Sequence, residues 1–162
     1  MSRIQDLLAE LTAEHDAFVT ALEAVDLDLV TVPGVVEDWS VRDLVVHVAF
    51  WAEHATDALR LATEGRGGEF AYDTSQTDAM NARLLEESRL TTPDAAVERE
   101  ERAYEGLAAA MSGLDPALLN VRLGNGDTVA DVIGYDGPEH YREHTAHLRA
   151  WFNEDAAEEE LT

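Results

Sequence analysis

Three histidines near the C-terminus are spaced so that they share one side of a helix. His140, His144 and His147 follow one another at intervals of four and three residues, and side chains at these intervals are neighbours on a helical surface. Two imidazoles one turn apart can bind a single divalent ion, whose bonds to nitrogen are about 2 Å long. The pattern therefore indicates either a metal site or two buried imidazoles that each need a hydrogen-bond partner.

A third ligand has to come from another helix. His47 and His54 are seven residues apart and also share a helical face. We favour His47 with His140 and His144, because three imidazoles leave positions on the ion open for water or substrate. His54 and His147 remain alternatives, as replacement ligands, as groups that hydrogen bond to a ligand, or as surface side chains.

The composition narrows the choice of ligands and of partners. The chain has no cysteine, so only imidazole and carboxylate groups can bind a metal. Its 162 residues include 34 acidic and 11 basic side chains, all of the latter arginine, for a net charge of −23. Because phosphates would be repelled by such a protein, we expect no nucleic acid and no membrane as partners. No leader or apolar span is apparent, which predicts a cytoplasmic protein.

The elements that must carry these histidines are helical. Apolar residues from Ile4 to Val25 recur every three or four positions and predict a first helix after Ser2, about 24 residues long. A loop follows over residues 26–39. Ser40 and Asp43 form a capping-box pattern that opens a second helix over residues 41–64, which carries His47 and His54.

The second half of the chain predicts two more helical segments. The third extends over residues 76–113 and is split at Thr92-Pro93 into a short and a longer helix. The last begins after Thr128, is disturbed at Gly137-Pro138 and resumes through Trp151. These patterns predict an all-α fold, an antiparallel four-helix bundle with a split third helix and a possible break before the histidine segment. We expect a single domain over residues 1–154, then an acidic tail over residues 155–162.

Two segments resemble a known family. Residues 39–51 read Trp-Ser-Val-Arg-Asp-Leu-Val-Val-His-Val-Ala-Phe-Trp, and residues 140–144 read His-Tyr-Arg-Glu-His, with Leu-Arg-Ala-Trp at residues 148–151. Together they resemble the DinB-like/YfiT-like superfamily, and the tryptophan-serine opening and the His-Tyr-x-Glu-His helix are most similar to its ClbS/DfsB-like branch. The resemblance extends over nearly the whole chain.

The resemblance implies a four-helix bundle running up, down, down and up, often found as a homodimer. In metal-binding members, the positions of His47, His140 and His144 coordinate nickel, zinc or a similar divalent ion. Known activities in the superfamily include transferases and isomerases that use a low-molecular-weight thiol, bacillithiol or mycothiol. ClbS-like members instead hydrolyse a cyclopropane, and they do not all bind a metal.

These observations predict a metal-dependent enzyme that acts on a small, electrophilic substrate as a thiol-dependent transferase or a hydrolase. Glu143 or Tyr141 would move the proton, and Glu143 or Asp43 could orient an imidazole. Aromatic candidates for the cavity wall are Trp39, Phe50, Trp51 and Tyr135. The alternatives are a metal-free ClbS-like hydrolase, a protein that binds or sequesters a small molecule, and a structural dimer whose histidines pair with carboxylates.

Overall fold

The first two helices begin at the caps that the sequence indicates. The computed structural model describes residues 2–161, with side chains as far as residue 152. Helix α1 spans Arg3–Glu23, and the Ser2 side chain accepts a hydrogen bond from the Gln5 backbone. Helix α2 spans Val41–Thr63 after a capping box in which Ser40 and Asp43 each bind the other's backbone N–H. These caps satisfy amides that have no partner within the helix.

The third segment is divided, as the sequence predicts. Helix α3 spans Thr77–Ser88 and helix α4 spans Pro93–Ser112. The Thr92 side chain accepts from the Ala95 backbone, and proline follows at the first helical position, where no amide hydrogen is needed.

The predicted break before the histidine segment is also present. Helix α5 spans Val129–Asp136 and helix α6 spans Pro138–Leu161, with Gly137 alone between them. A Cβ on Gly137 would lie 2.5 Å from the Ile133 carbonyl oxygen, so only glycine fits this junction. The acidic side chains of the tail expected at residues 155–162 lie outside the described residues.

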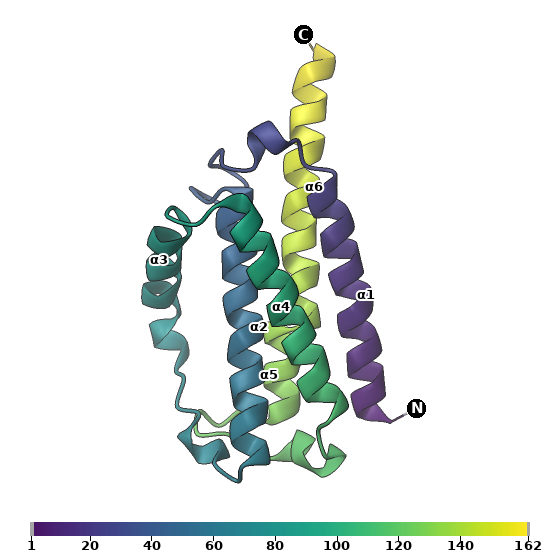
Figure 1. Ribbon diagram of the computed structural model, residues 1–162, viewed down its shortest axis with the longest axis vertical. Helices are drawn as coiled ribbons and strands as arrows, with labels where there is room; N and C mark the ends of the chain where they lie inside the picture. Colours follow the sequence, from purple (N-terminus) through teal and green to yellow (C-terminus); the bar gives the residue numbers. More distant parts are fainter. Residues whose placement is uncertain (1, 162) are drawn as a thin grey trace.

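Four long helices form the bundle. In Figure 1, α1 and α6 rise toward the C-terminus whereas α2 and α4 descend, which is the up, down, down, up order. Helix α2 packs mainly on α4, and α1 on α6. Helix α3 stands outside this bundle beside α2 and brings the chain back so that α4 can run in the same direction as α2 (Figure 1). The all-α fold is confirmed.

The core is apolar, and most of α2 lies within it. Fully buried side chains include Leu11 and Phe18 of α1, Leu44 of α2, Leu107 of α4 and Leu148 of α6. Within the described residues there is no strand; Arg122 forms an isolated bridge with Thr128. None of the described helices is long and apolar enough to cross a membrane.

Candidate metal centre and adjoining cavity

The structure brings His47, His140 and His144 together. The Nε2 atom of His140 lies 2.8 Å from Nε2 of His47 and 2.9 Å from Nε2 of His144. One nitrogen from each ring falls within 4.8 Å of the others. Helix α2 supplies the first histidine, and two successive turns of α6 supply the other two. The i, i+4 spacing is thus used as the sequence predicts, against a histidine from the facing helix.

All three imidazoles are held neutral by their surroundings. Burial lowers the pKa of His47 and of His140 to about 3 each, and each also lies beside a neighbouring imidazole that opposes its protonation. The pKa of His144 is lowered further, again mainly by burial. Neutral imidazole is the form that binds a metal, so no proton has to leave these rings at neutral pH.

The hydrogen-bonding pattern fits a cation better than it fits three free imidazoles. A neutral imidazole has one N–H and one lone pair. Nε2 of His140 is in contact with Nε2 of both other rings, so lone pairs face one another wherever hydrogen is lacking, and a shared ion removes that repulsion. The Nδ1 atoms of His47 and His140 are buried and have no partner among the described residues, so neither ring is held by a carboxylate. The donor set suits nickel or zinc.

His147 and Asp43 occupy other roles near the three histidines. Nδ1 of His147 lies 3.1 Å from Nδ1 of His144, so His147 supports a candidate ligand. Asp43 does not reach His47, because its carboxylate binds the Ser40 backbone and accepts a 2.5 Å hydrogen bond from the Ser88 hydroxyl. The edge of the Trp39 ring packs on His47, with 4.5 Å between ring centroids.

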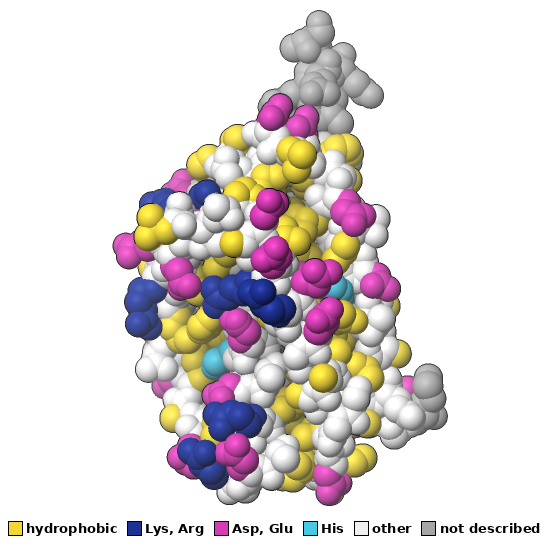
Figure 2. Space-filling model, in the orientation of Figure 1, with side chains coloured by type: hydrophobic (Ala, Val, Ile, Leu, Met, Phe, Trp, Pro, Cys, Tyr) yellow, Lys and Arg dark blue, Asp and Glu magenta, His cyan; other side chains and the backbone are white. Residues whose placement is uncertain are grey.

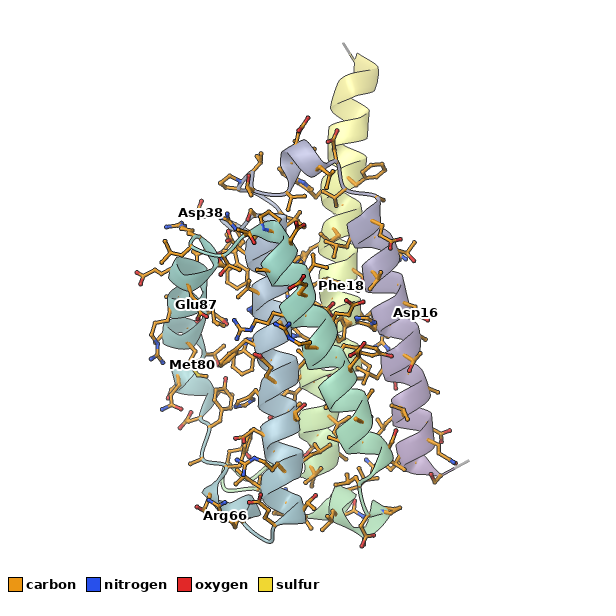
Figure 3. All side chains as sticks on the ribbon, viewed as in Figure 1. Asp16, Phe18, Asp38, Arg66, Met80 and Glu87 are labelled. Atoms are coloured by element: carbon orange, nitrogen blue, oxygen red, sulfur yellow. The ribbon has the colours of Figure 1, made fainter. Side chains whose placement is uncertain are left out.

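A cavity of about 280 Å³ opens beside the centre. Its lining comes from α2, from α3 and the segment before it, from α5 and the segment before it, and from the first turn of α6. Figure 3 shows side chains of α2 and α3 projecting toward one another between these helices. Polar and aromatic side chains dominate its wall. The lining residues are His47, Trp51, Tyr72, Thr74, Thr77, Asn81, Asp127, Tyr135, Asp136 and His140. Two of the aromatic candidates, Trp51 and Tyr135, thus face the cavity.

His54 lies in a separate pair on the same side of the bundle. Its Nδ1 atom is 3.0 Å from Oδ2 of Asp136, and both side chains are largely buried. Burial raises the pKa of Asp136 to about 6, while the hydrogen bond from His54 opposes that shift. Because Asp136 also lines the cavity, it is a carboxylate poised to exchange a proton near neutral pH.

The two predicted proton-transfer residues are not in the cavity wall. Tyr141 is fully buried, and its hydroxyl donates a 2.7 Å hydrogen bond to Glu100 of α4. His15 of α1 lies 2.9 Å from the same carboxylate oxygen. Glu143 is exposed on α6. The side chains of Tyr141 and Glu143 therefore point away from the cavity, although both residues are adjacent in sequence to candidate ligands.

The cavity residues that the sequence did not indicate are Tyr72, Thr74, Thr77, Asn81, Asp127 and Asp136. Asp136 stands four residues before His140 and lines the same cavity, but it lies on α5, and the Gly137-Pro138 junction interrupts the helical period that would relate the two residues. Asn81 accepts a 3.1 Å hydrogen bond from the Trp51 indole, a contact between segments 30 residues apart. No local signal in the sequence indicates that contact.

Comparison with known proteins assigns the chain to a family. Residues 8–151 match the family described as the mycothiol maleylpyruvate isomerase N-terminal domain. The chain belongs to this family. The assignment confirms the resemblance to the DinB-like superfamily. A comparison with curated protein sequences gave no match.

Two solved structures have the same fold as this family member. One is an uncharacterised protein from Escherichia coli UTI89, with a TM-score of 0.81 and 14% identity over 96% of each chain. The other is the colibactin self-resistance protein ClbS in complex with a dsDNA, with a TM-score of 0.78 and 15% identity over 93% of this chain and 95% of that one. At these identities the likeness shows the fold.

The second structure corrects an expectation drawn from net charge. The charge of −23 led us to exclude a nucleic-acid partner, and that exclusion is wrong, because ClbS, a protein of this fold, was crystallised with duplex DNA. Net charge is summed over the whole molecule, whereas a duplex contacts one face. Arginines here are unevenly spread: in Figure 2 they gather on the half of the face that carries α2 and α3.

Proposed function

We propose that this protein is a metal-dependent enzyme that binds nickel or zinc through His47, His140 and His144 and acts on a small molecule in the adjoining cavity. The supporting observation is the convergence of three neutral imidazoles, two of them buried, at the edge of that cavity. The reaction would be a thiol-dependent transfer or a hydrolysis at an electrophilic centre. Membership of a family named for a mycothiol-dependent isomerase supports a low-molecular-weight thiol as cosubstrate.

Side chains of the cavity would bind the substrate and accept the proton that a bound water or thiol releases. A divalent ion on the three nitrogens would supply Lewis acidity and lower the pKa of a bound water or thiol. Of the two carboxylates in the cavity wall, Asp136 is the candidate acceptor for the released proton, since burial raises its pKa to about 6, close to neutral pH. Trp51 and Tyr135 provide apolar surface for the substrate. One chain contains this whole set, so a homodimer, which remains an expectation, is not required for it.

The placement of Asp136 makes it a better candidate for proton transfer than Tyr141 or Glu143. Tyr141 is committed to Glu100, and burial together with that carboxylate raises its pKa well above 10. Its hydroxyl would release a proton only at strongly alkaline pH. Glu143 is exposed to solvent on α6 and does not line the cavity, so its carboxylate is not beside the substrate.

Elemental analysis of untagged protein tests the proposal. We expect about one equivalent of nickel or zinc in the wild type, as three imidazole ligands require. The His140→Ala, His144→Ala double variant should lose the metal and keep its helical circular dichroism. A wild type that contains no metal and cannot be loaded with nickel or zinc would contradict the proposal.

The structural similarity to ClbS supports a second candidate function. A metal-free member could use the same cavity to hydrolyse or sequester a reactive small molecule, as the description of ClbS as a self-resistance protein suggests. In that case the cavity variants Asp136→Asn and Asn81→Ala should impair function, whereas treatment with a chelator should leave it unchanged.

A further inference from the structure

The charge on the cavity wall indicates the class of ligand. Two carboxylates, those of Asp127 and Asp136, contribute to the lining, and the lining contains no arginine. The arginines of nearby helices are paired elsewhere: Arg60 lies against Asp57 and Glu64, and Arg99 against Glu53. An anionic ligand would therefore meet two like charges and find no guanidinium in the wall.

Asp136 is fixed in position and has spare capacity to accept hydrogen bonds. Its side chain is 8% exposed, and Oδ2 is held by His54 of α2 at 3.0 Å. The other oxygen, Oδ1, makes no hydrogen bond to the residues that the structure describes. A carboxylate held on one side and free on the other is a preorganised acceptor for a charged donor. With a pKa of about 6, it is ionised at pH 7.5.

Asp127 reinforces the same end of the cavity. The hydroxyl of Tyr135 donates to Oδ2 of Asp127 at 3.0 Å, and the Asn125 amide donates to the same oxygen at 3.2 Å. These bonds fix the carboxylate beside the Tyr135 ring. The negative field of Asp127 also contributes to the raised pKa of Asp136, so the two carboxylates act on the same region.

Aromatic rings supply the remainder of a site for an organic cation. Trp51 and Tyr72 meet edge to face with 5.4 Å between their centroids, and both line the cavity. Indole and phenol faces attract ammonium groups and also pack against apolar bodies. The histidine centre lies at the same cavity, through His47 and His140.

We propose that the cavity selects a small amine, with its ammonium group against Asp136 and Asp127 and its apolar body on Trp51 and Tyr72. This inference rests on the proposed function in one respect, namely that the part of the substrate that reacts faces the histidine centre. It distinguishes this chain from an enzyme for a dicarboxylate such as the maleylpyruvate of the family's name. Apart from a divalent ion on the histidines, a dianion would find no cationic side chain in the cavity wall and would meet two aspartates.

Three probes with the same aromatic body and different charge test the inference: 2-phenylethylamine, 2-phenylethanol and 3-phenylpropionate. Binding at pH 7.5 is followed by tryptophan fluorescence, with calorimetry as a second measurement. We expect the amine to bind at least about tenfold more tightly than the carboxylate, as a charge-assisted hydrogen bond in a partly buried site predicts. The alcohol should fall between them.

A matched pair of variants isolates the carboxylate. Asp136→Asn keeps the shape and an acceptor for His54, and it should weaken amine binding about tenfold while leaving the alcohol unaffected. Glu139→Gln removes an exposed carboxylate close by in sequence that does not line the cavity, and it should change neither. Equal affinity for the three probes, tighter binding of the carboxylate, no binding of the amine, or an unaltered Asp136→Asn variant would each overturn the inference.

Metal content measured on the same samples separates this inference from the proposed function. Each titration is run on protein treated with a chelator and on protein loaded with zinc. Loss of the amine preference in protein that holds one zinc would overturn the inference and leave the metal centre intact. A preference for the amine in protein that never takes up metal would support the inference and contradict the proposed function.

Discussion

The imidazole of His54 and the carboxylate of Asp136 are joined by a 3.0 Å hydrogen bond that links α2 to the end of α5. The sequence favours His47 as the metal ligand from α2 and leaves His54 as an alternative. The bond to Asp136 holds His54 on the carboxylate, whereas His47 lies 2.8 Å from His140. The geometry therefore favours His47 over His54 as the ligand from α2.

Variants of His54 and His147 should differ in their effect on the metal. His54→Ala is expected to keep the full zinc stoichiometry and affinity, because its ring contacts no candidate ligand nitrogen. His147→Ala removes the group at 3.1 Å from Nδ1 of His144 and should lower zinc affinity about tenfold, as loss of a partner to a ligand does. Competition with a chromophoric chelator measures both. Loss of zinc from His54→Ala would show that the ligand set is wrong.

Binding of 2-phenylethylamine should weaken as pH falls through about 6. The pKa of Asp136 is about 6 because the group is buried, and the protonated carboxyl no longer attracts an ammonium group. The groups that face it are His54 from α2, Asp127 from the segment before α5, and His140 across the cavity. Affinity measured from pH 5 to 8 should therefore rise toward the alkaline end, and the slope should flatten in Asp136→Asn.

The raised pKa of Asp136 also makes the stability of the fold depend on pH. The folded-state pKa of Asp136, about 6, exceeds its ordinary value of 3.8, so the folded protein holds this proton more tightly than the unfolded chain. The resulting stabilisation is complete below pH 4 and is lost as pH rises through 6. Asp136→Asn lacks this titration. Its free energy of unfolding should therefore rise by about 1 to 3 kcal/mol relative to that of wild type when the pH is raised from 4 to 7. Urea unfolding at both pH values measures the difference; a constant difference would contradict the shift.

Features that depend on near neighbours in the chain were predictable, and features that depend on packing partners were not. The Ser40 cap and the paired His140 and His144 follow from spacings of three or four residues. The contact of Tyr141 with Glu100 depends instead on how α6 is rotated against α4. Adjacency to His140 made Tyr141 resemble a catalytic residue, yet successive helical residues point about 100° apart. Asp136 was missed because the Gly137 junction interrupts the helical period.

Tyr141→Phe separates a structural role from a catalytic one. The hydroxyl bonds to Glu100 in the core, so its removal leaves a buried carboxylate with fewer donors and should cost about 1 to 3 kcal/mol of unfolding free energy. Zinc stoichiometry should not change, because the hydroxyl lies outside the cavity wall. Urea unfolding and elemental analysis measure the two effects. Phe18→Leu, an apolar change that leaves Glu100 its donors, is the control for packing around the Tyr141 ring, which it contacts.

Gly137→Ala should disturb the metal centre from outside it. A Cβ at this residue would lie 2.5 Å from the Ile133 carbonyl oxygen, and because that atom belongs to the backbone, α5 and α6 would have to shift relative to each other. Since α6 carries His140 and His144, the shift should reduce zinc affinity as well as cost about 2 kcal/mol or more of stability.

Gly134→Ala is the matched control for this substitution, three residues earlier on α5. The nearest atom to a Cβ there is the flexible Glu139 carboxylate at 3.9 Å, so alanine fits without displacement. Alanine also favours the helix and should leave stability unchanged or raise it by up to about 1 kcal/mol, with no effect on zinc. Thermal unfolding and chelator competition on both variants compare the two sites. Equal behaviour of Gly137→Ala and Gly134→Ala would mean that the α5–α6 junction does not set the position of the histidines.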